Sequence, residues 1–332
     1  MQNSTQAKQI IITGRGRSGT NWLMDTLDAS PLTHCRSEPY VNPASPLSHL
    51  TRVWETGKAD SEIASKWDNI VHLLALRMSV RDHHFKHPKF YIRPLAQHLK
   101  LPYLLSRPKL RKTLGIFMPS LRGIEWKIPT WIASQSDLED AYTVLKVNFD
   151  AFIIQWILEN RTHASVLHIV RHPGGRLNSW MNRFLSSSDA EHVLNDYKKK
   201  LKNISDFDES FSQKIGNIDS LSLIQAELWM WRYINESIYL AANMYPNYRL
   251  VVYEDFAENP VQYAKELYEH CSLPWNEQIE KTISDSVQDS VWGRIPGTSK
   301  DVANAWKQKL NPEYAQTVSK VLQDSLMQDW WD

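Results

Sequence analysis

The sequence predicts an α/β fold in which a central parallel β-sheet is flanked by helices and carries a helical, basic insertion. Residues 9–13 form a β-branched run that breaks at a glycine and passes into a helical pattern. Residues 142–147 form a mostly apolar run, and 165–171 form another that ends before a Pro-Gly-Gly turn. Apolar runs of this kind are typical of strands buried on both faces, as in parallel sheets.

Length and composition set broad bounds. A chain of 332 residues is long for one core, but mixed α/β enzymes of this size often stay one domain with insertions, so we expect residues 1–332 to form a single domain. The net charge of +1 says nothing about partners, and two distant cysteines, Cys35 and Cys271, favour a reducing compartment. The polar start leads straight into a strand and no stretch approaches about 18 apolar residues, so we expect a cytoplasmic protein without a signal peptide or membrane span.

The first strand, Gln9–Thr13, leads into a turn with three glycines and two arginines, followed by a helix from about Thr20 to Ala29. Glycines let backbone N–H groups crowd an anion, and the helix dipole favours negative charge at this end. Arg15 and Arg17 add fixed cations. The turn therefore predicts a site for a phosphorylated or sulfated ligand. The alternative, an ordinary turn between strand and helix, gives no reason for arginines interleaved with glycines.

This turn is close to a nucleotide-binding P-loop but departs from it. Gly14 and Gly19 have the G-x-x-x-x-G spacing of a Walker A motif. Thr20 and Asn21 stand where Lys and Ser/Thr would reach the β- and γ-phosphates and magnesium. The sequence therefore predicts a P-loop-like turn and disfavours an NTPase.

The run Arg17–Trp22 resembles the 5′-phosphosulfate loop of sulfotransferases, which use 3′-phosphoadenosine 5′-phosphosulfate (PAPS), release 3′-phosphoadenosine 5′-phosphate (PAP) and need no metal. That family has Lys or Arg at the position of Arg17, so the resemblance implies that Arg17 acts in catalysis. It also implies that Trp22 stacks on adenine. The nucleotide-binding residues implied in this loop are Arg15, Gly16, Arg17, Ser18, Gly19, Thr20, Asn21 and Trp22.

Glu38 is a candidate general base. It follows a short predicted strand at Thr33–Cys35, and a carboxylate beyond the carboxyl end of a strand lies at the rim where open α/β sheets bind ligands. Carbohydrate-type sulfotransferases have a Glu-Pro pair at a similar distance from the loop, and here Glu38 and Pro39 follow Arg17 by 21 and 22 positions. A solvated loop acid is the alternative.

Residues 42–131 are predicted to form a mostly helical insertion, with an amphipathic stretch near 61–80. Between Arg77 and Lys127, twelve lysines and arginines outnumber two acids, a charge of about +10, with apolar residues interleaved. An anionic oligosaccharide, a nucleic acid, an acidic membrane surface and a solvated face without a partner remain open. We expect the insertion to shape the acceptor site. Three histidines here lack a paired Cys or carboxylate and predict no zinc site: His83, His84 and His87.

Lys146 lies near the carboxyl end of the strand at 142–147, where it can contact a sulfuryl oxygen; the alternative is that it extends from the strand end into water. A helix at Asp150–Asn160 follows. The cytosolic steroid and phenol sulfotransferases have Lys-Thr-His here, with the His as base. This chain has Asn148 in place of that His, which moves the role of base to Glu38.

A second anion site is predicted after the strand at 165–171. Arg171 ends the strand and Ser179 lies eight positions later on a helix, so both can hold one phosphate, Arg by a bidentate pair and Ser through its hydroxyl. This spacing resembles the 3′-phosphate site of sulfotransferases. Two anion sites on one sheet suit a bisphosphate nucleotide.

The last third of the chain is predicted to contain a long core helix at 221–244, a strand at 248–253 and a helix that starts at Pro260. Residues 285–332 resemble the C-terminal lid and helix of the family. The resemblance implies that three residues close over the nucleotide: Arg294, Ser299 and Lys300.

The resemblance covers roughly residues 9–40, 142–184 and 245–325 and implies a PAPS-dependent sulfotransferase. Its acceptor would bear a hydroxyl group, with an anionic carbohydrate among the candidates because of the Glu-Pro pair. No metal and no nucleic acid are expected, and peripheral membrane contact stays open. Two alternatives remain: a kinase-like phosphoryl transferase with a related fold, and a non-enzymatic module that binds polyanions or membranes through the insertion.

Overall fold

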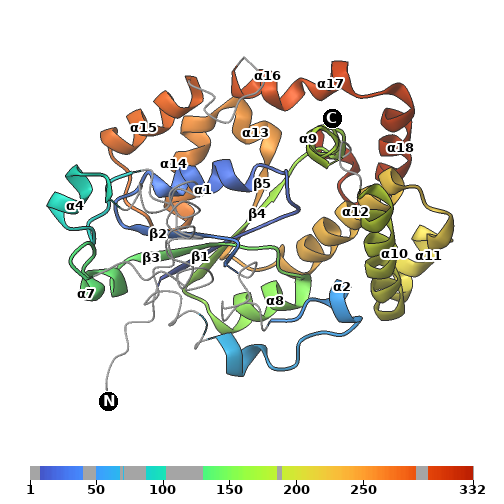
Figure 1. The fold of residues 1–332 in the computed structure, drawn as a ribbon, viewed down its shortest axis with the longest axis horizontal. Helices are drawn as coiled ribbons and strands as arrows, with labels where there is room; N and C mark the ends of the chain where they lie inside the picture. Colours follow the sequence, from blue (N-terminus) through green and yellow to red (C-terminus); the bar gives the residue numbers. More distant parts are fainter. Residues whose placement is uncertain are drawn as a thin grey trace, which may run out of the picture.

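A computed structural model describes residues 8–39, 50–67, 70, 87–101, 130–184, 189–288 and 298–331. Five parallel strands form one sheet in the order β2-β3-β1-β4-β5, which confirms the predicted fold class (Figure 1). The strands are β1 (Gln9–Thr13), β2 (Thr33–Ser37), β3 (Tyr142–Lys146), β4 (Ala164–Val170) and β5 (Tyr248–Val252).

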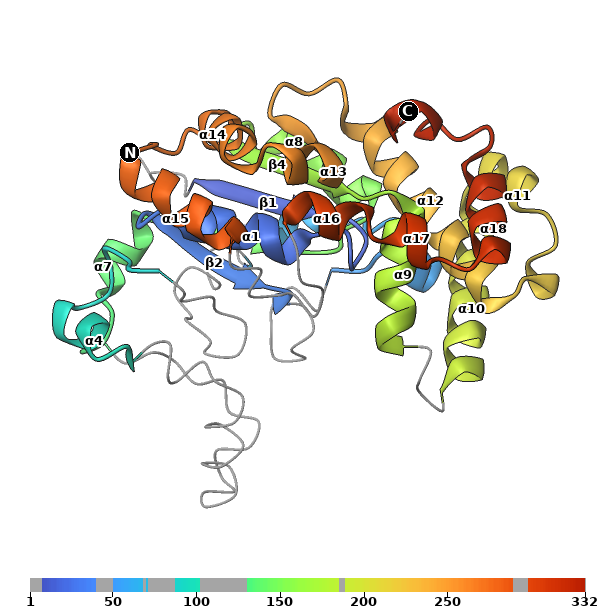
Figure 2. The same ribbon diagram turned by 90° about the horizontal axis from the view of Figure 1, so that it is seen from above.

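Helices cover both faces of this sheet, as Figures 1 and 2 show. The α-helices are α1 (Thr20–Asp28), α2 (Val53–Thr56), α4 (Pro94–His98), α7 (Gln135–Glu139), α8 (Ala151–Asn160), α9 (Pro173–Phe184), α10 (Ala190–Phe207), α11 (Glu209–Ile215), α12 (Leu223–Ala242), α13 (Tyr253–Glu258), α14 (Pro260–His270), α15 (Glu277–Gln288), α16 (Ser299–Asn304), α17 (Trp306–Lys309) and α18 (Pro312–Leu322). Two short 3-10 helices are η4 (Ile218–Ser220) and η5 (Gln328–Trp331).

The core is divided into two layers because neighbouring residues of each strand point to opposite faces. Ile11 of β1 packs in a cluster with α8, α10 and α12, whereas Ile10 and Ile12 pack in a second cluster with α1, α13 and α14. All five residues of β1 and all five of β3 are buried. The strands are therefore buried on both faces, as their unbroken apolar runs predicted.

Element boundaries differ from the sequence prediction by a few residues. β2 extends to Ser37, so Glu38 follows the strand directly. The long helix α12 starts after Ser222, whose side chain and that of Gln225 form a capping box. It ends at Ala242, and residues 243–247 lead from it to β5.

Part of the predicted insertion is described. Residues 63–67 are helical, and Ile63, Trp67 and Ile70 are buried in the first cluster, which fits the amphipathic stretch predicted near 61–80. Of the basic stretch 77–127, residues 87–101 and no others are described, so most of the predicted basic face lies outside the described residues.

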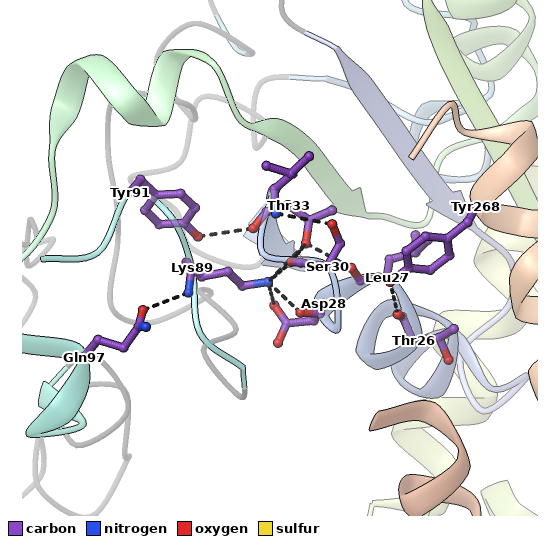
Figure 3. A network of polar contacts seen from close by, with 10 residues as sticks. Thr26, Leu27, Asp28, Ser30, Thr33, Lys89, Tyr91, Gln97 and Tyr268 are labelled. Atoms are coloured by element: carbon purple, nitrogen blue, oxygen red, sulfur yellow. Dashed lines mark hydrogen bonds and ion pairs between the residues drawn. The ribbon is translucent and has the colours of Figure 1, made fainter. Parts of the chain in front are cut away.

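Within 87–101, Lys89 is buried and connects the insertion to α1 and β2 (Figure 3). Its Nζ donates to the carbonyl oxygens of Asp28 (2.6 Å) and Ser30 (2.8 Å) and to Oγ1 of Thr33 (3.1 Å). It also forms an ion pair with Asp28 Oδ1 at 2.9 Å, and both side chains are fully buried. Lys89 is therefore an internal cation and adds nothing to a basic surface.

We expect Lys89→Met to lower the free energy of unfolding by about 3–5 kcal/mol, because it leaves the buried carboxylate of Asp28 without its counter-charge. Urea unfolding measures this loss, and Lys100→Met, in the same segment but exposed, is the control, with a change of about 0.5 kcal/mol or less. A double variant with Asp28→Asn is expected to recover part of the loss. Equal losses for Lys89→Met and Lys100→Met would contradict the burial of this pair.

Candidate anion-binding site at the carboxyl edge of the sheet

The predicted site residues lie at one edge of the sheet because all five strands are parallel. In the register, Lys146 is opposite Ile12 of β1 and Ser37 of β2. The strand order therefore places Glu38, Lys146, the turn 14–19 and Arg171 next to one another, in that sequence, across the edge. In open α/β sheets ligands bind at this edge.

Two glycines of the turn are required by close approaches. A Cβ on Gly14 (φ 141°) would lie 2.3 Å from the carbonyl oxygen of Ile169, and one on Gly19 (φ 97°) would lie 2.4 Å from the ring of Tyr253. Gly19 is also the N-cap of α1, so no side chain covers the first N–H groups of that helix. The turn thus packs directly against β4 and α13, with the helix N-terminus as an anion-binding feature.

The two arginines of this turn have different surroundings. Arg17 is exposed, has a positive φ of 76° and donates from Nε to Oγ of Ser179 on α9 (3.1 Å). This bond brings the first loop and the second predicted anion site into contact. Such a φ is uncommon for a residue with a side chain and is kept where the surrounding structure fixes it.

Arg15 instead pairs with a buried carboxylate that the sequence analysis did not single out. Its Nη2 lies 2.9 Å from Oε2 of Glu227 on α12, and Arg176 of α9 forms an ion pair with the other carboxylate oxygen. Burial alone would raise the pKa of Glu227. The two guanidinium groups and a hydrogen bond from Tyr197 lower this pKa by more than burial raises it, so its net shift is downward. The carboxylate is therefore ionised at neutral pH. Its signal in the sequence is an acid among the apolar residues of the long helix, a feature that it shares with Glu236.

Tyr253 joins the two predicted anion sites. Its ring lies against Gly19, and the guanidinium carbon of Arg171 lies 4.3 Å from the centre of the ring. Arg171 is buried and donates from Nη2 to the carbonyl oxygen of Val302 on α16 (3.2 Å). The sequence predicted no more for this tyrosine than the end of the strand at 248–253; its position directly after β5, at the same sheet edge, is the signal that could have marked it.

Trp22 belongs to the same aromatic group. Its ring stacks on Phe256 with a centroid distance of 4.0 Å and meets Tyr253 edge-on at 5.7 Å. Trp22 is half-buried and follows the turn in the third position of α1. Its stacking on adenine stays a prediction.

Glu38, Lys146 and Asn21 form a polar group on the other side of the turn. Lys146 Nζ lies 3.2 Å from Glu38 Oε1 and donates to Oδ1 of Asn21. The Glu38 backbone has φ 48° and donates its N–H to the carbonyl oxygen of Lys146 (2.9 Å). Lys146 is buried rather than extended into water, whereas the Glu38 side chain is 41% exposed. The candidate base is thus accessible and held by its neighbouring cation.

The C-terminal segment packs on α9 and α13. Ser299 Oγ donates to the carbonyl oxygen of Ala257 (2.7 Å), and Lys300 pairs with Glu258. Both side chains therefore contact α13, and their contact with a nucleotide stays a prediction. Arg294 lies outside the described residues.

His172, next to Arg171, is covered by Trp306 of α17 at a centroid distance of 4.1 Å. The same indole occupies the space where a Cβ on Gly174 would lie. Burial, helped by Lys307 and Arg171, lowers the pKa of His172 to about 4. This imidazole is therefore neutral at pH 7 and adds no charge beside Arg171.

Neither a cluster of metal ligands nor a helix suited to a membrane is present in the described part of the chain. No group of three or more His, Cys, Asp or Glu side chains is arranged there to hold a metal ion. His83 and His84 lie outside it. Among the described helices, none combines the length and the apolar character needed to span a membrane.

Comparisons with known proteins show which family and which solved structures this chain is similar to. The model of a family described as "Sulfotransferase family" matches residues 9–277. Similar solved structures include mouse sulfotransferase SULT7A1 complexed with PAP (11% identity, TM-score 0.46, 97% of this chain and 85% of that one), the sulfotransferase domain of the Synechococcus PCC 7002 olefin synthase (16%, 0.39, 96% and 96%) and retinol dehydratase in a complex with retinol and PAP (12%, 0.38, 97% and 82%). No curated protein sequence matches this chain. The family match spans the turn, Glu38, Lys146, Arg171 and Tyr253, and ends before α16.

Proposed function

This chain belongs to the sulfotransferase family, and from that premise we propose that it transfers a sulfuryl group from PAPS to a hydroxyl group of a carbohydrate or another small molecule. The observation that carries the proposal is the arrangement around Tyr253. The turn 14–19, through Gly19, and the guanidinium of Arg171 both lie against its ring, so the two candidate anion sites are neighbours at one sheet edge. PAPS carries anionic groups at both its 3′ and 5′ positions and can occupy two such sites at once.

Arg171 and Ser179 hold the 3′-phosphate in this proposal. The Ser179 oxygen accepts a hydrogen bond from Arg17, which leaves the hydroxyl proton to donate to a phosphate oxygen. The backbone N–H groups of residues 19–21 bind the 5′-phosphate, supported by the dipole of α1, whereas that of Ser18 donates to the carbonyl oxygen of Arg15 (3.2 Å). Trp22 stacks on adenine, and Ser299 and Lys300 close over the nucleotide.

In the reaction, an acceptor hydroxyl attacks the sulfur atom in line with the bond to the bridging oxygen. The new O–S bond forms as the S–O bond to PAP breaks, and Glu38 takes the hydroxyl proton. Negative charge develops on the bridging oxygen, where Arg17 and Lys146 stabilise it. The ammonium group of Lys146, 3.2 Å from Glu38, also keeps the carboxylate at the edge where the acceptor must approach.

The identity of the acceptor is proposed from one sequence feature and from the position of the insertion. The Glu38-Pro39 pair supports a carbohydrate, and residues 42–131 are proposed to shape the acceptor site because they lie outside the nucleotide motifs. A screen of hydroxyl-bearing acceptors with radiolabelled PAPS, run without magnesium, identifies the acceptor class. Magnesium-dependent turnover of ATP in a parallel assay would instead favour a phosphoryl transferase.

Calorimetry with two nucleotides tests the nucleotide site. We expect wild type to bind PAP at least about tenfold more tightly than adenosine 5′-monophosphate, because a charge-assisted pair to the 3′-phosphate is lost. Arg171→Ala is expected to weaken PAP by a similar factor and to leave the affinity for adenosine 5′-monophosphate unchanged. Equal affinity of the wild type for both nucleotides would overturn the assignment of Arg171.

A further inference from the structure

A network of buried ion pairs links the turn 14–19 to two helices, α9 and α12. Glu227 of α12 is completely buried, and its two carboxylate oxygens face Arg15 of the turn and Arg176 of α9. Arg15 approaches with both Nη2 (2.9 Å) and Nε (3.4 Å). The carboxylate is therefore surrounded by two cations from different parts of the chain.

Arg176 connects this network to the backbone of the turn. It is itself buried, and its Nε donates to the carbonyl oxygen of Gly16 at 2.8 Å while its Nη1 pairs with Glu227. Arg15 and Gly16 are consecutive residues, so one is held through its side chain and the other through its carbonyl group. The middle of the turn is thus fixed at two adjacent points.

The turn needs such support because its own sequence does not fix its shape. Gly14, Gly16 and Gly19 have many accessible conformations in the unfolded chain, and ordering them costs conformational entropy. Arg17, one residue beyond Gly16, adopts a positive φ of 76°. A strained conformation of this kind persists when surrounding contacts determine it.

We propose that Glu227 is a positioning residue for the nucleotide site. Through Arg15 and Arg176 it holds the turn in the conformation that directs the N–H groups of residues 19–21 toward the 5′-phosphate. This inference rests on the proposed function. It also changes the role of Arg15, which the sequence predicted to bind the nucleotide. Its guanidinium instead orders the turn by pairing with the buried Glu227.

A positioning role and a purely electrostatic role predict opposite changes. If the charge of Glu227 mattered only by offsetting Arg15 and Arg176, removing it would make the site more positive and PAP would bind more tightly. If Glu227 positions the turn, removing the charge weakens every ligand that needs the 5′-phosphate contact. Adenosine 3′-monophosphate, which lacks that phosphate, is then unaffected.

The test compares Glu227→Gln with Glu236→Gln by calorimetry and thermal melting. Glu236 lies on the same helix and is also buried, and it pairs with Arg232 (3.1 Å), whose guanidinium binds carbonyl groups at the C-terminal segment instead of the turn. Both variants therefore lose one buried carboxylate charge and are expected to melt at lower temperature. Glu227→Gln is expected to weaken PAP by about tenfold to a hundredfold, the scale of one charge-assisted contact, and Glu236→Gln to leave it unchanged.

Unchanged or tighter binding of PAP to Glu227→Gln would overturn the inference, as would an equal loss of affinity for adenosine 3′-monophosphate. Should Glu227→Gln fail to fold, Arg176→Lys keeps a positive charge but removes the Nε bond to Gly16, and the same selective loss is expected. Glu227→Asp, which keeps the charge, is expected to recover part of the affinity for PAP. Failure of wild type itself to bind PAP would instead contradict the proposed function, so the two failures are distinct.

Discussion

Arg17→Ala is expected to reduce kcat about a thousandfold, while PAP affinity falls by about tenfold or less. The side chain is exposed beside Ser179, next to the place where the proposed reaction breaks the bond between sulfur and the bridging oxygen. Charge on that oxygen develops only in the transition state, so an interaction with it contributes to kcat more than to binding. Steady-state kinetics with a saturating acceptor and PAP calorimetry separate the two effects.

Two further variants control this experiment. Arg17→Lys keeps the charge but not the fork of donors, and we expect it to retain more turnover than the alanine variant. Arg249→Ala removes an arginine of β5 that pairs with Glu266 (2.8 Å) and is expected to change kcat little. Wild-type turnover by Arg17→Ala would remove Arg17 from the chemistry.

The sequence was enough to predict where those candidate site residues lie whose positions depend on local chain geometry. The spacing of Gly14 and Gly19 reflects two close approaches, to Ile169 and to Tyr253, and the glycines alone were enough to predict a turn there. Because parallel strands end at one edge, placing Glu38, Lys146 and Arg171 at strand ends was enough to predict that they gather.

Partners that are distant in the sequence could not be predicted in this way. Arg15 and Arg17 are the same residue type and lie two positions apart, but their surroundings differ. Arg15 pairs with the buried Glu227, 212 residues later in the sequence, whereas Arg17 is exposed. Likewise Lys89 counted toward a basic face, whereas it is buried against Asp28. The number of charged residues in a segment does not show which of them are buried, because burial depends on packing across the whole fold.

Glu38→Gln is expected to lower kcat about a hundredfold to ten-thousandfold, the usual contribution of a general base. The variant keeps the size of the side chain and the positive φ of 48° but cannot accept a proton. PAP affinity is expected to stay within about twofold of wild type, since the nucleotide contacts proposed above do not include this residue. Acceptor turnover over a range of pH, together with PAP calorimetry, measures both.

The pH profile separates a base from a mere partner of Lys146. A carboxylate that only orients Lys146, 3.2 Å away, would affect turnover without setting its pH dependence, and Lys146→Gln would then reproduce the effect of Glu38→Gln. A carboxylate that accepts the proton must be ionised, so wild-type kcat/KM falls at acidic pH, and this fall disappears in Glu38→Gln but persists in Lys146→Gln. If Glu38→Gln keeps the acidic fall, Glu38 is not the base. The proton then leaves through another group, and the insertion at 42–131 is the part of the chain in which to seek it.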